Sequence, residues 1–395
     1  MKKKIFVLTL MFVLLISFAV TASVEQDKKM FHTLFTQPEG NIAELFTDNF
    51  LNQVPESQVI QILNTYKNNL GQLQEVEETE EGYKLIFTKG SAPSKISVNS
   101  NNKIAGIWFG QMTLADDDYE KILNEFKNLD GDISVYVVKD NQEEIIALNE
   151  NEKMAVGSSF KLYVLKALYE QIESSEKSWQ DIIKIDKENV SLFSGILQNW
   201  PLDTPMTVNS MANLMISHSD NTATDHLIDY IGRDYLEAMT GSQNTPFLKT
   251  IEMFRLKYGL NSKEQNDYIE GDLESKRNVL KEIKDIQISG KDITSEPTLI
   301  NEIEWFFSTK ELSHTIYQLR ESEEIQINPG LANKSDWYKV GYKGGSEAGV
   351  LQYTHLLQKS SDGPIYVVSV TGNSEEGLNT DKITNLTARL ISTLN

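Results

Sequence analysis

A serine and a lysine stand three residues apart in Gly157-Ser158-Ser159-Phe160-Lys161, just before an apolar run with helical spacing. Positions i and i+3 share a helix face, so we expect Ser158 and Lys161 to project side by side from the first turn. Unpaired backbone N–H groups and the positive end of the helix dipole also lie there. A hydroxyl beside an amine able to take its proton is the arrangement of an activated nucleophile. An ordinary capped core helix with a solvent-facing lysine shows the same spacing, so the pair needs support from elsewhere in the chain.

Two further motifs carry polar side chains at the ends of predicted elements. Ser219-Asp220-Asn221 lies between helical runs at 208–216 and 222–231, and Lys343-Gly344-Gly345-Ser346 stands at the end of a predicted strand. Each motif has a structural interpretation of its own. Asp220 or Asn221 would cap the second helix, and the glycines would favour a turn between strands.

The elements that position these motifs form one predicted domain over residues 118–395. Strand-like runs stand near both of its ends, and a long helical middle reaches to about residue 320. The expected strands are 133–138, 145–148, 337–342, 349–357 and 364–371, and a helix over 381–394 closes the chain. This order predicts an α+β fold, in which an antiparallel sheet built from both termini of the domain lies beside a helical lobe.

A smaller unit is predicted ahead of it, over residues 23–113. Its apolar spacing and turn residues predict two helices followed by a four-strand meander. The helices are expected at 41–51 and 57–70, and the strands at 73–76, 83–88, 95–98 and 104–109. This order of elements resembles that of small NTF2-like α+β modules. No candidate catalytic cluster falls in this unit, and its partner is not indicated.

Residues 1–22 have the pattern of a secretory signal peptide. Lys2, Lys3 and Lys4 precede an apolar run, and Val20-Thr21-Ala22 offers small residues for cleavage. We therefore expect a secreted or cell-envelope protein of bacterial type, with no stable membrane insertion after signal cleavage; an uncleaved N-terminal anchor is the alternative. The absence of cysteine excludes disulfides and thiol chemistry. A formal net charge of −20 argues against nucleic-acid binding.

Taken together and in this order, the three motifs resemble the S-x-x-K, S-D-N and K-[TS]-G set of the serine β-lactamases and penicillin-binding proteins. The stretches Ser191–Gln198 and Ser219–Thr224 are also similar to the corresponding parts of class A β-lactamases. The resemblance covers residues 118–395 and implies the same α+β fold as the pattern of elements.

The resemblance implies a role for each motif residue. Ser158 would be the acylated nucleophile, and Lys161, in a partly desolvated cleft, its base. Ser219 would pass a proton toward the leaving nitrogen. Asn221 would hold the substrate amide, and Lys343 would supply positive potential for Ser219 and for a substrate carboxylate.

The same resemblance implies an oxyanion hole formed by the backbone N–H groups of Ser158 and Ser346. Gly344 and Gly345 would let a substrate backbone approach the strand. One departure stands out here, because Gly344 lacks the hydroxyl that the family motif places between the lysine and the glycine. A substrate carboxylate would be bound less well, and Ser346 would compensate in part.

A second departure concerns release of the acyl group. Class A β-lactamases carry E-x-x-L-N, whose glutamate activates the hydrolytic water. The matching region at 247–257 contains Glu252, but its leucine follows at a different interval and no asparagine comes after it. Glu252 is the candidate deacylating base. The alternative is a structural glutamate beside Lys249 or Arg255.

The sequence therefore predicts an exported serine hydrolase of the β-lactamase/penicillin-binding class, acylated by an amide or ester such as a β-lactam or peptidoglycan-like substrate. A cell-wall DD-peptidase, an esterase and a degenerate, non-catalytic binding protein are the alternatives. No cofactor and no metal are expected. His218 and His226 flank the S-D-N motif without a carboxylate at metal spacing, which favours structural roles for both.

Overall fold

The computed structural model describes residues 24–80, 82–110 and 112–394, so the predicted signal peptide lies outside the described residues. Contacts divide the chain into two compact units. One contains the residues up to 122 together with 381–394, and the other contains residues 123–380. The C-terminal segment, expected in the second domain, is thus grouped with the first unit. The predicted boundary between residues 113 and 118 stays a prediction.

The first unit is a helix-backed antiparallel sheet in the order β1-β2-β3-β4, with β5 paired to β3. Its strands are β1 (Leu73–Thr79), β2 (Gly82–Phe87), β3 (Gly90–Val98), β4 (Ile104–Phe109) and β5 (Thr113–Leu114). Its helices are α1 (Val24–Thr36), α2 (Asp48–Gln53) and α3 (Glu56–Leu70), with 3₁₀ turns η1 (Glu39–Asn41) and η2 (Ala43–Leu45). The meander and α3 agree with expectation. The helix predicted at 41–51 is divided into 3₁₀ turns at its start and α2 at its end, and α1 was not predicted.

The second unit has a five-stranded antiparallel sheet in the order β12-β13-β14-β6-β7. The strands of the unit are β6 (Asp132–Lys139), β7 (Glu143–Leu148), β8 (Met154–Ala155), β9 (Ile182–Lys184), β10 (Pro205–Thr207), β11 (Phe306–Phe307), β12 (Lys339–Glu347), β13 (Val350–Gln358) and β14 (Ile365–Asn373). Strands from both ends of the unit thus form one sheet, which confirms the predicted α+β fold class. The edge strand β12 extends through residues 343–346, so this motif lies inside a strand and not in a turn after it.

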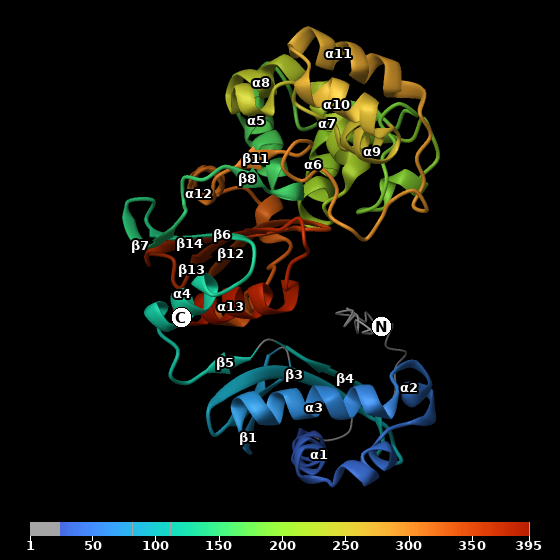
Figure 1. Cartoon of the computed structure of the whole chain (residues 1–395). Coiled ribbons are helices and arrows are strands. Elements are labelled where there is room, and N and C mark those ends of the chain that lie inside the picture. Colours follow the sequence, from blue (N-terminus) through green and yellow to red (C-terminus); the bar gives the residue numbers. More distant parts are fainter. Residues whose placement is uncertain (1–23, 81, 111, 395) are drawn as a thin grey trace. The chain divides into compact units, whose positions relative to one another are not determined.

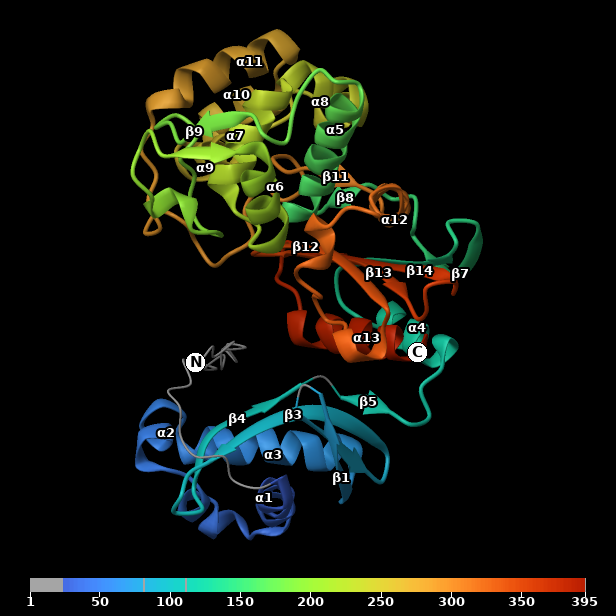
Figure 2. The ribbon, with the colours of Figure 1, turned by 180° about the vertical axis from the view of Figure 1, so that it is seen from behind.

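Helices form the other part of this unit, and Figures 1 and 2 show α5 to α11 gathered in one lobe. They are α5 (Lys161–Glu173), α6 (Val208–Ser217), α7 (Asn221–Ile231), α8 (Arg233–Thr240), α9 (Thr250–Tyr258), α10 (Ser262–Glu270) and α11 (Leu273–Glu282), and α12 (Thr309–Gln318) packs on the sheet. The 3₁₀ turns are η3 (Gly157–Phe160), η4 (Leu197–Asn199), η5 (Ser242–Asn244), η6 (Ile283–Asp285), η7 (Glu324–Gln326) and η8 (Lys334–Asp336). Two more helices, α4 (Tyr119–Lys127) and α13 (Thr380–Ser392), flank the unit in sequence.

Helix α5 is the centre of the lobe and contacts α6, α7, α8 and α12. All side chains from Phe160 to Leu165 are buried, so the start of this helix is enclosed on every side. Each fully buried leucine or valine here contributes about 1.5–3 kcal/mol relative to exposure. Phe160 also stacks on Trp305 with ring centroids 3.8 Å apart. This packing fixes the turn that carries Ser158.

Within the described residues, no helix is long and apolar enough to cross a membrane.

Candidate active site

Ser158 lies in the 3₁₀ turn η3, between the short strand β8 and helix α5. The helix does not begin at the serine, as the spacing predicted, but at Lys161. Residues three apart eclipse one another in a 3₁₀ turn, so Ser158 and Lys161 still share a side. The turn enters through Gly157 at φ +49°, a conformation that glycine adopts without strain. Ser158 is half-buried, and the described residues provide no hydrogen bond to its hydroxyl.

The Lys161 side chain is completely buried, and its amine points at the S-D-N motif. Its Nζ lies 2.6 Å from the carbonyl oxygen of Ser219, 3.1 Å from Ser219 Oγ and 2.7 Å from Asn221 Oδ1. Burial, and then the charge of Lys343, hold the pKa of Lys161 well below its usual range. An amine that loses its proton this easily is suited to act as a base.

Ser219 stands between α6 and α7 with a left-handed backbone, φ +54°. A serine in this region costs of order 1 kcal/mol or more, and such residues concentrate at functional sites. Its Oγ is 3.1 Å from Lys161 Nζ and also 3.1 Å from Lys343 Nζ. A hydroxyl both donates and accepts, so Ser219 can pass a proton between the two amines.

Lys343 reaches this hydroxyl from strand β12, and its amine also donates to the carbonyl of Gly344. Burial lowers the pKa of Lys343 to about 7. The side chain is therefore partly protonated at neutral pH and supplies positive potential at the edge of the sheet.

Asp220 and Asn221 hold the loop beside this cluster. Asp220 caps α7 by accepting from Ala223 N at 2.8 Å, and the same carboxylate accepts from the amides of the loop that leads into η4. The Asn221 amide donates to the carbonyls of Leu192 and Phe193, both at 2.8 Å. Both N–H groups of Asn221 are thus engaged, and its predicted contact with a substrate amide competes with these bonds.

The turn η3 touches strand β12 at two glycines. A Cβ on Gly345 would lie 2.5 Å from Ser158 N, and one on Gly157 would lie 3.1 Å from Ser346 N. Only glycine at 345 permits this approach. The amide nitrogens of Ser158 and Ser346 therefore stand close together, which is what a two-donor oxyanion hole needs.

The model of the beta-lactamase enzyme family matches residues 117–393. The chain belongs to this family. It is 30% identical over 113 residues to a beta-lactamase of Bacillus amyloliquefaciens and 26% identical over 113 residues to one of Bacillus subtilis (strain 168). Each match covers 29% of this chain and 36% of the relative, so the chain spans about a third of the length of these curated relatives. The crystal structure of the beta-lactamase from Sphaerobacter thermophilus DSM 20745 is 18% identical, with a TM-score of 0.48, and covers 70% of this chain and 98% of that one.

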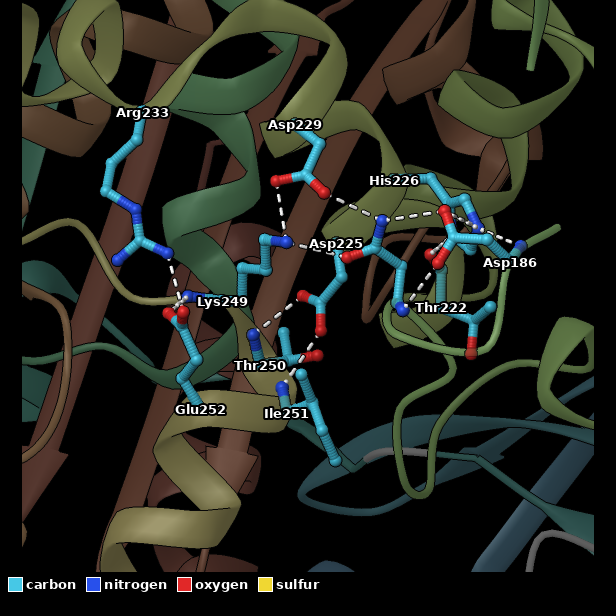
Figure 3. A network of polar contacts seen from close by, with 11 residues as sticks. Asp186, Thr222, Asp225, His226, Asp229, Arg233, Lys249, Thr250, Ile251 and Glu252 are labelled. Atoms are coloured by element: carbon cyan, nitrogen blue, oxygen red, sulfur yellow. Dashed lines mark hydrogen bonds and ion pairs between the residues drawn. The ribbon is translucent and has the colours of Figure 1, made fainter. Parts of the chain in front are cut away.

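In this beta-lactamase-family chain, Glu252 does not join the cluster around Ser158. Figure 3 shows its carboxylate bound by Arg233 Nη2 at 2.6 Å and by the backbone N of Lys249 at 2.8 Å. It lines a cavity of about 380 Å³ whose lining includes none of the S-x-x-K, S-D-N or K-G-G motif residues. The structural alternative fits this placement, because the glutamate ties the start of α9 to α8. The assignment of Glu252 as the deacylating base is corrected accordingly.

A threonine occupies the start of α9 where that helix approaches the cluster. Thr250 is buried, and its Oγ1 bonds with Ser191 Oγ at 2.6 Å and donates to the Asn221 carbonyl at 3.4 Å. The nearby carboxylate of Asp225 is also engaged, since it accepts from Thr250 N at 2.6 Å and Ile251 N at 2.9 Å (Figure 3). Burial raises the pKa of Asp225 to about 7. Neither side chain is free to activate a water as a glutamate would.

The remaining polar residues of this region are structural. His226 bonds through Nδ1 to the Thr222 carbonyl at 2.7 Å and accepts at Nε2 from Asp186 N at 2.9 Å. The sequence pattern singles out His226 and misses Asp225. The one signal for Asp225 was its position, since it follows Asn221 by one helical turn and therefore shares its face.

Proposed function

We propose that this chain is an exported serine hydrolase of the β-lactamase/penicillin-binding class that is acylated at Ser158 by an amide or ester such as a β-lactam. The observation that carries the proposal is the buried amine of Lys161 beside Ser219, with a second amine, that of Lys343, on the same hydroxyl. Export rests on the basic and apolar pattern of residues 1–22.

In the proposed reaction, Ser158 Oγ attacks the substrate carbonyl carbon and its proton passes to the neutral amine of Lys161. The carbonyl oxygen becomes an oxyanion that accepts from the N–H groups of Ser158 and Ser346. The bond to the leaving nitrogen then breaks as Ser219 donates its proton to that nitrogen. Lys161 returns a proton to Ser219, and the acyl group remains on Ser158.

Release of the acyl group is the slow half of the proposed cycle. The Glu252 carboxylate forms an ion pair with Arg233, and the residue of α9 that approaches Asn221 is Thr250. This arrangement favours a second candidate within the same class, a penicillin-binding DD-peptidase or esterase that turns β-lactams over poorly.

Intact-mass spectrometry after incubation with a fluorescent penicillin tests the proposal. We expect a single adduct that is lost in Ser158→Ala and kept in the control Ser335→Ala, whose serine is exposed. An adduct that persists for hours supports the penicillin-binding alternative, whereas rapid release of hydrolysed drug supports β-lactamase turnover. If no β-lactam or activated ester forms an adduct, the acylation proposal is wrong and a non-catalytic binding protein replaces it.

A further inference from the structure

The missing hydroxyl at Gly344 has a structural counterpart two residues earlier in the same strand. A Cβ built on Gly344 would lie 2.9 Å from Tyr342 Cζ, and the phenolic oxygen is closer still. Positions i and i+2 share a face of a strand, which explains how the side chain of Tyr342 comes to lie over Gly344. The backbone of Gly344 is outside the left-handed region, so its conformation does not demand glycine. What the glycine provides is room for the Tyr342 hydroxyl.

The ring of Tyr342 is held in this position from both sides. Its centroid is 4.6 Å from that of His355, on the neighbouring strand β13. Gly330, at φ +60°, covers both rings so closely that a Cβ there would lie 2.5 Å from Tyr342 Cδ2. His355 is fixed in turn, because its Nε2 accepts from Leu331 N at 2.9 Å. A ring clamped in this way directs its hydroxyl to one place.

The hydroxyl itself is available for a ligand. It makes no hydrogen bond with any described residue, and the side chain of Tyr342 is half-buried and not enclosed. Burial of the ring raises the pKa of Tyr342 above its usual value, so the group keeps its proton at physiological pH. Lys343 Nζ, the adjacent cation, bonds to the Gly344 carbonyl. A neutral donor and a positive charge thus flank Gly344, which is a suitable setting for a carboxylate.

We propose that the Tyr342 hydroxyl donates a hydrogen bond to the carboxylate of the acylating substrate and so replaces the hydroxyl that Gly344 lacks. This inference rests on the proposed acylation of Ser158 and names a specificity-determining residue for it. It predicts preference for substrates that carry an anionic group beside the scissile amide.

Benzylpenicillin and its methyl ester form a matched pair of probes, because they differ in the carboxylate alone. The quantity to measure is the ratio of their second-order acylation rate constants, followed by intact mass. We expect Tyr342→Phe to lower this ratio about tenfold, the effect of losing one hydrogen bond to a charged group. Tyr136→Phe is the control, since its hydroxyl bonds to Glu144 at 3.0 Å, away from the motif residues. In the control the ratio should stay at the wild-type value.

A second pair of variants moves the hydroxyl to the usual place in the motif. Tyr342→Leu removes the ring from above residue 344, and adding Gly344→Ser to that variant should raise the ratio again. An unchanged ratio in Tyr342→Phe, with the wild type acylated normally, would overturn the role of Tyr342 and leave acylation standing. If the wild type is acylated by neither probe, the proposed function fails and the role of Tyr342 fails with it.

Discussion

Replacing Glu252 by glutamine separates its structural role from the catalytic role that its place in the sequence suggested. The Arg233 Nη2 to Glu252 Oε1 distance is 2.6 Å, with side-chain exposures of 24% and 12%. Breaking a fully buried ion pair costs about 3–5 kcal/mol, and an exposed pair is worth about 0.2–1 kcal/mol. Glutamine keeps an acceptor for the Lys249 amide, so this partly buried pair should lose about 1–2 kcal/mol. The melting temperature should therefore fall by about 2–8 °C.

The assay combines thermal unfolding with the rate at which a penicillin adduct is lost. Glu264→Gln is the control, because Glu264 accepts from Asn261 N at 2.9 Å at the start of α10 without an arginine partner. Its melting temperature should fall less than that of Glu252→Gln, and both variants should release the acyl group at the wild-type rate. A hundredfold slower release in Glu252→Gln, with acylation unchanged, would restore this glutamate as the deacylating base and refute the reasoning from its pairing.

Three further outcomes are expected. Gly345→Ala places a Cβ 2.5 Å from Ser158 N and should slow adduct formation about a hundredfold, as the loss of one oxyanion donor does, measured by time-resolved intact mass. Acylation by benzylpenicillin should fall as pH rises through about 7, because Lys343, whose pKa is lowered to about 7, then loses its positive charge; a pH profile that is flat from 6 to 8 would contradict this. Asp225→Ala leaves two buried amides at the start of α9 without an acceptor and should cost about 2–4 kcal/mol in urea unfolding, whereas a loss below about 1 kcal/mol would count against that role.

Much of the acylation half of the site follows from sequence because its residues are attached to the ends of regular elements. Ser158 and Lys161 lie at the start of α5, Ser219 precedes α7, and Lys343 lies in the edge strand. Spacing within one element fixes which side chains share a face. The structure accordingly brings Lys161, Ser219 and Lys343 together. It places Ser158 in the 3₁₀ turn that replaces the first turn of the predicted helix.

The interpretation of Glu252 failed because its partner is not local. The Glu252 carboxylate pairs with Arg233, 19 residues earlier in the chain. The cations close to Glu252 in the sequence are Lys249 and Arg255. Spacing along the chain does not say which cation a partly buried carboxylate will meet. The helix expected at 41–51 was only partly right, since η1 and η2 replace its first half with short turns that local apolar spacing does not distinguish from a helix, and α2 begins at Asp48.

Tyr342 shows a further limit of reading motifs position by position. In the sequence motif, Gly344 indicates the loss of a hydroxyl group. Side chains alternate between the two faces of a strand, so Tyr342 is expected on the same face as residue 344. What period alone does not give is the direction of the ring, which depends on His355 and on Gly330. The position of the Tyr342 hydroxyl beside Gly344 therefore depends on residues from three separate segments, which the motif alone does not contain.

The two buried lysines divide acid and base roles through their surroundings. Both amines lie 3.1 Å from Ser219 Oγ, so they stand no more than about 6 Å apart. Two positive charges at that distance repel by about 3 kcal/mol at an effective dielectric of about 20. Burial adds to this cost, so protonation of both amines at once is disfavoured. Burial lowers the pKa of both lysines, and the charge of Lys343 lowers that of Lys161 further, which favours Lys161 as the base.

Lys161 donates to three acceptors of the S-D-N motif, at 2.6 Å to the Ser219 carbonyl, 2.7 Å to Asn221 Oδ1 and 3.1 Å to Ser219 Oγ. A neutral amine has one N–H fewer than an ammonium, so on losing its proton Lys161 gives up one of these bonds and gains a lone pair that can take the Ser158 proton. Lys343 donates to the same Ser219 hydroxyl from the edge where an anion would bind. One residue type thus supplies both the base and the cation, because environment moves the two pKa values apart.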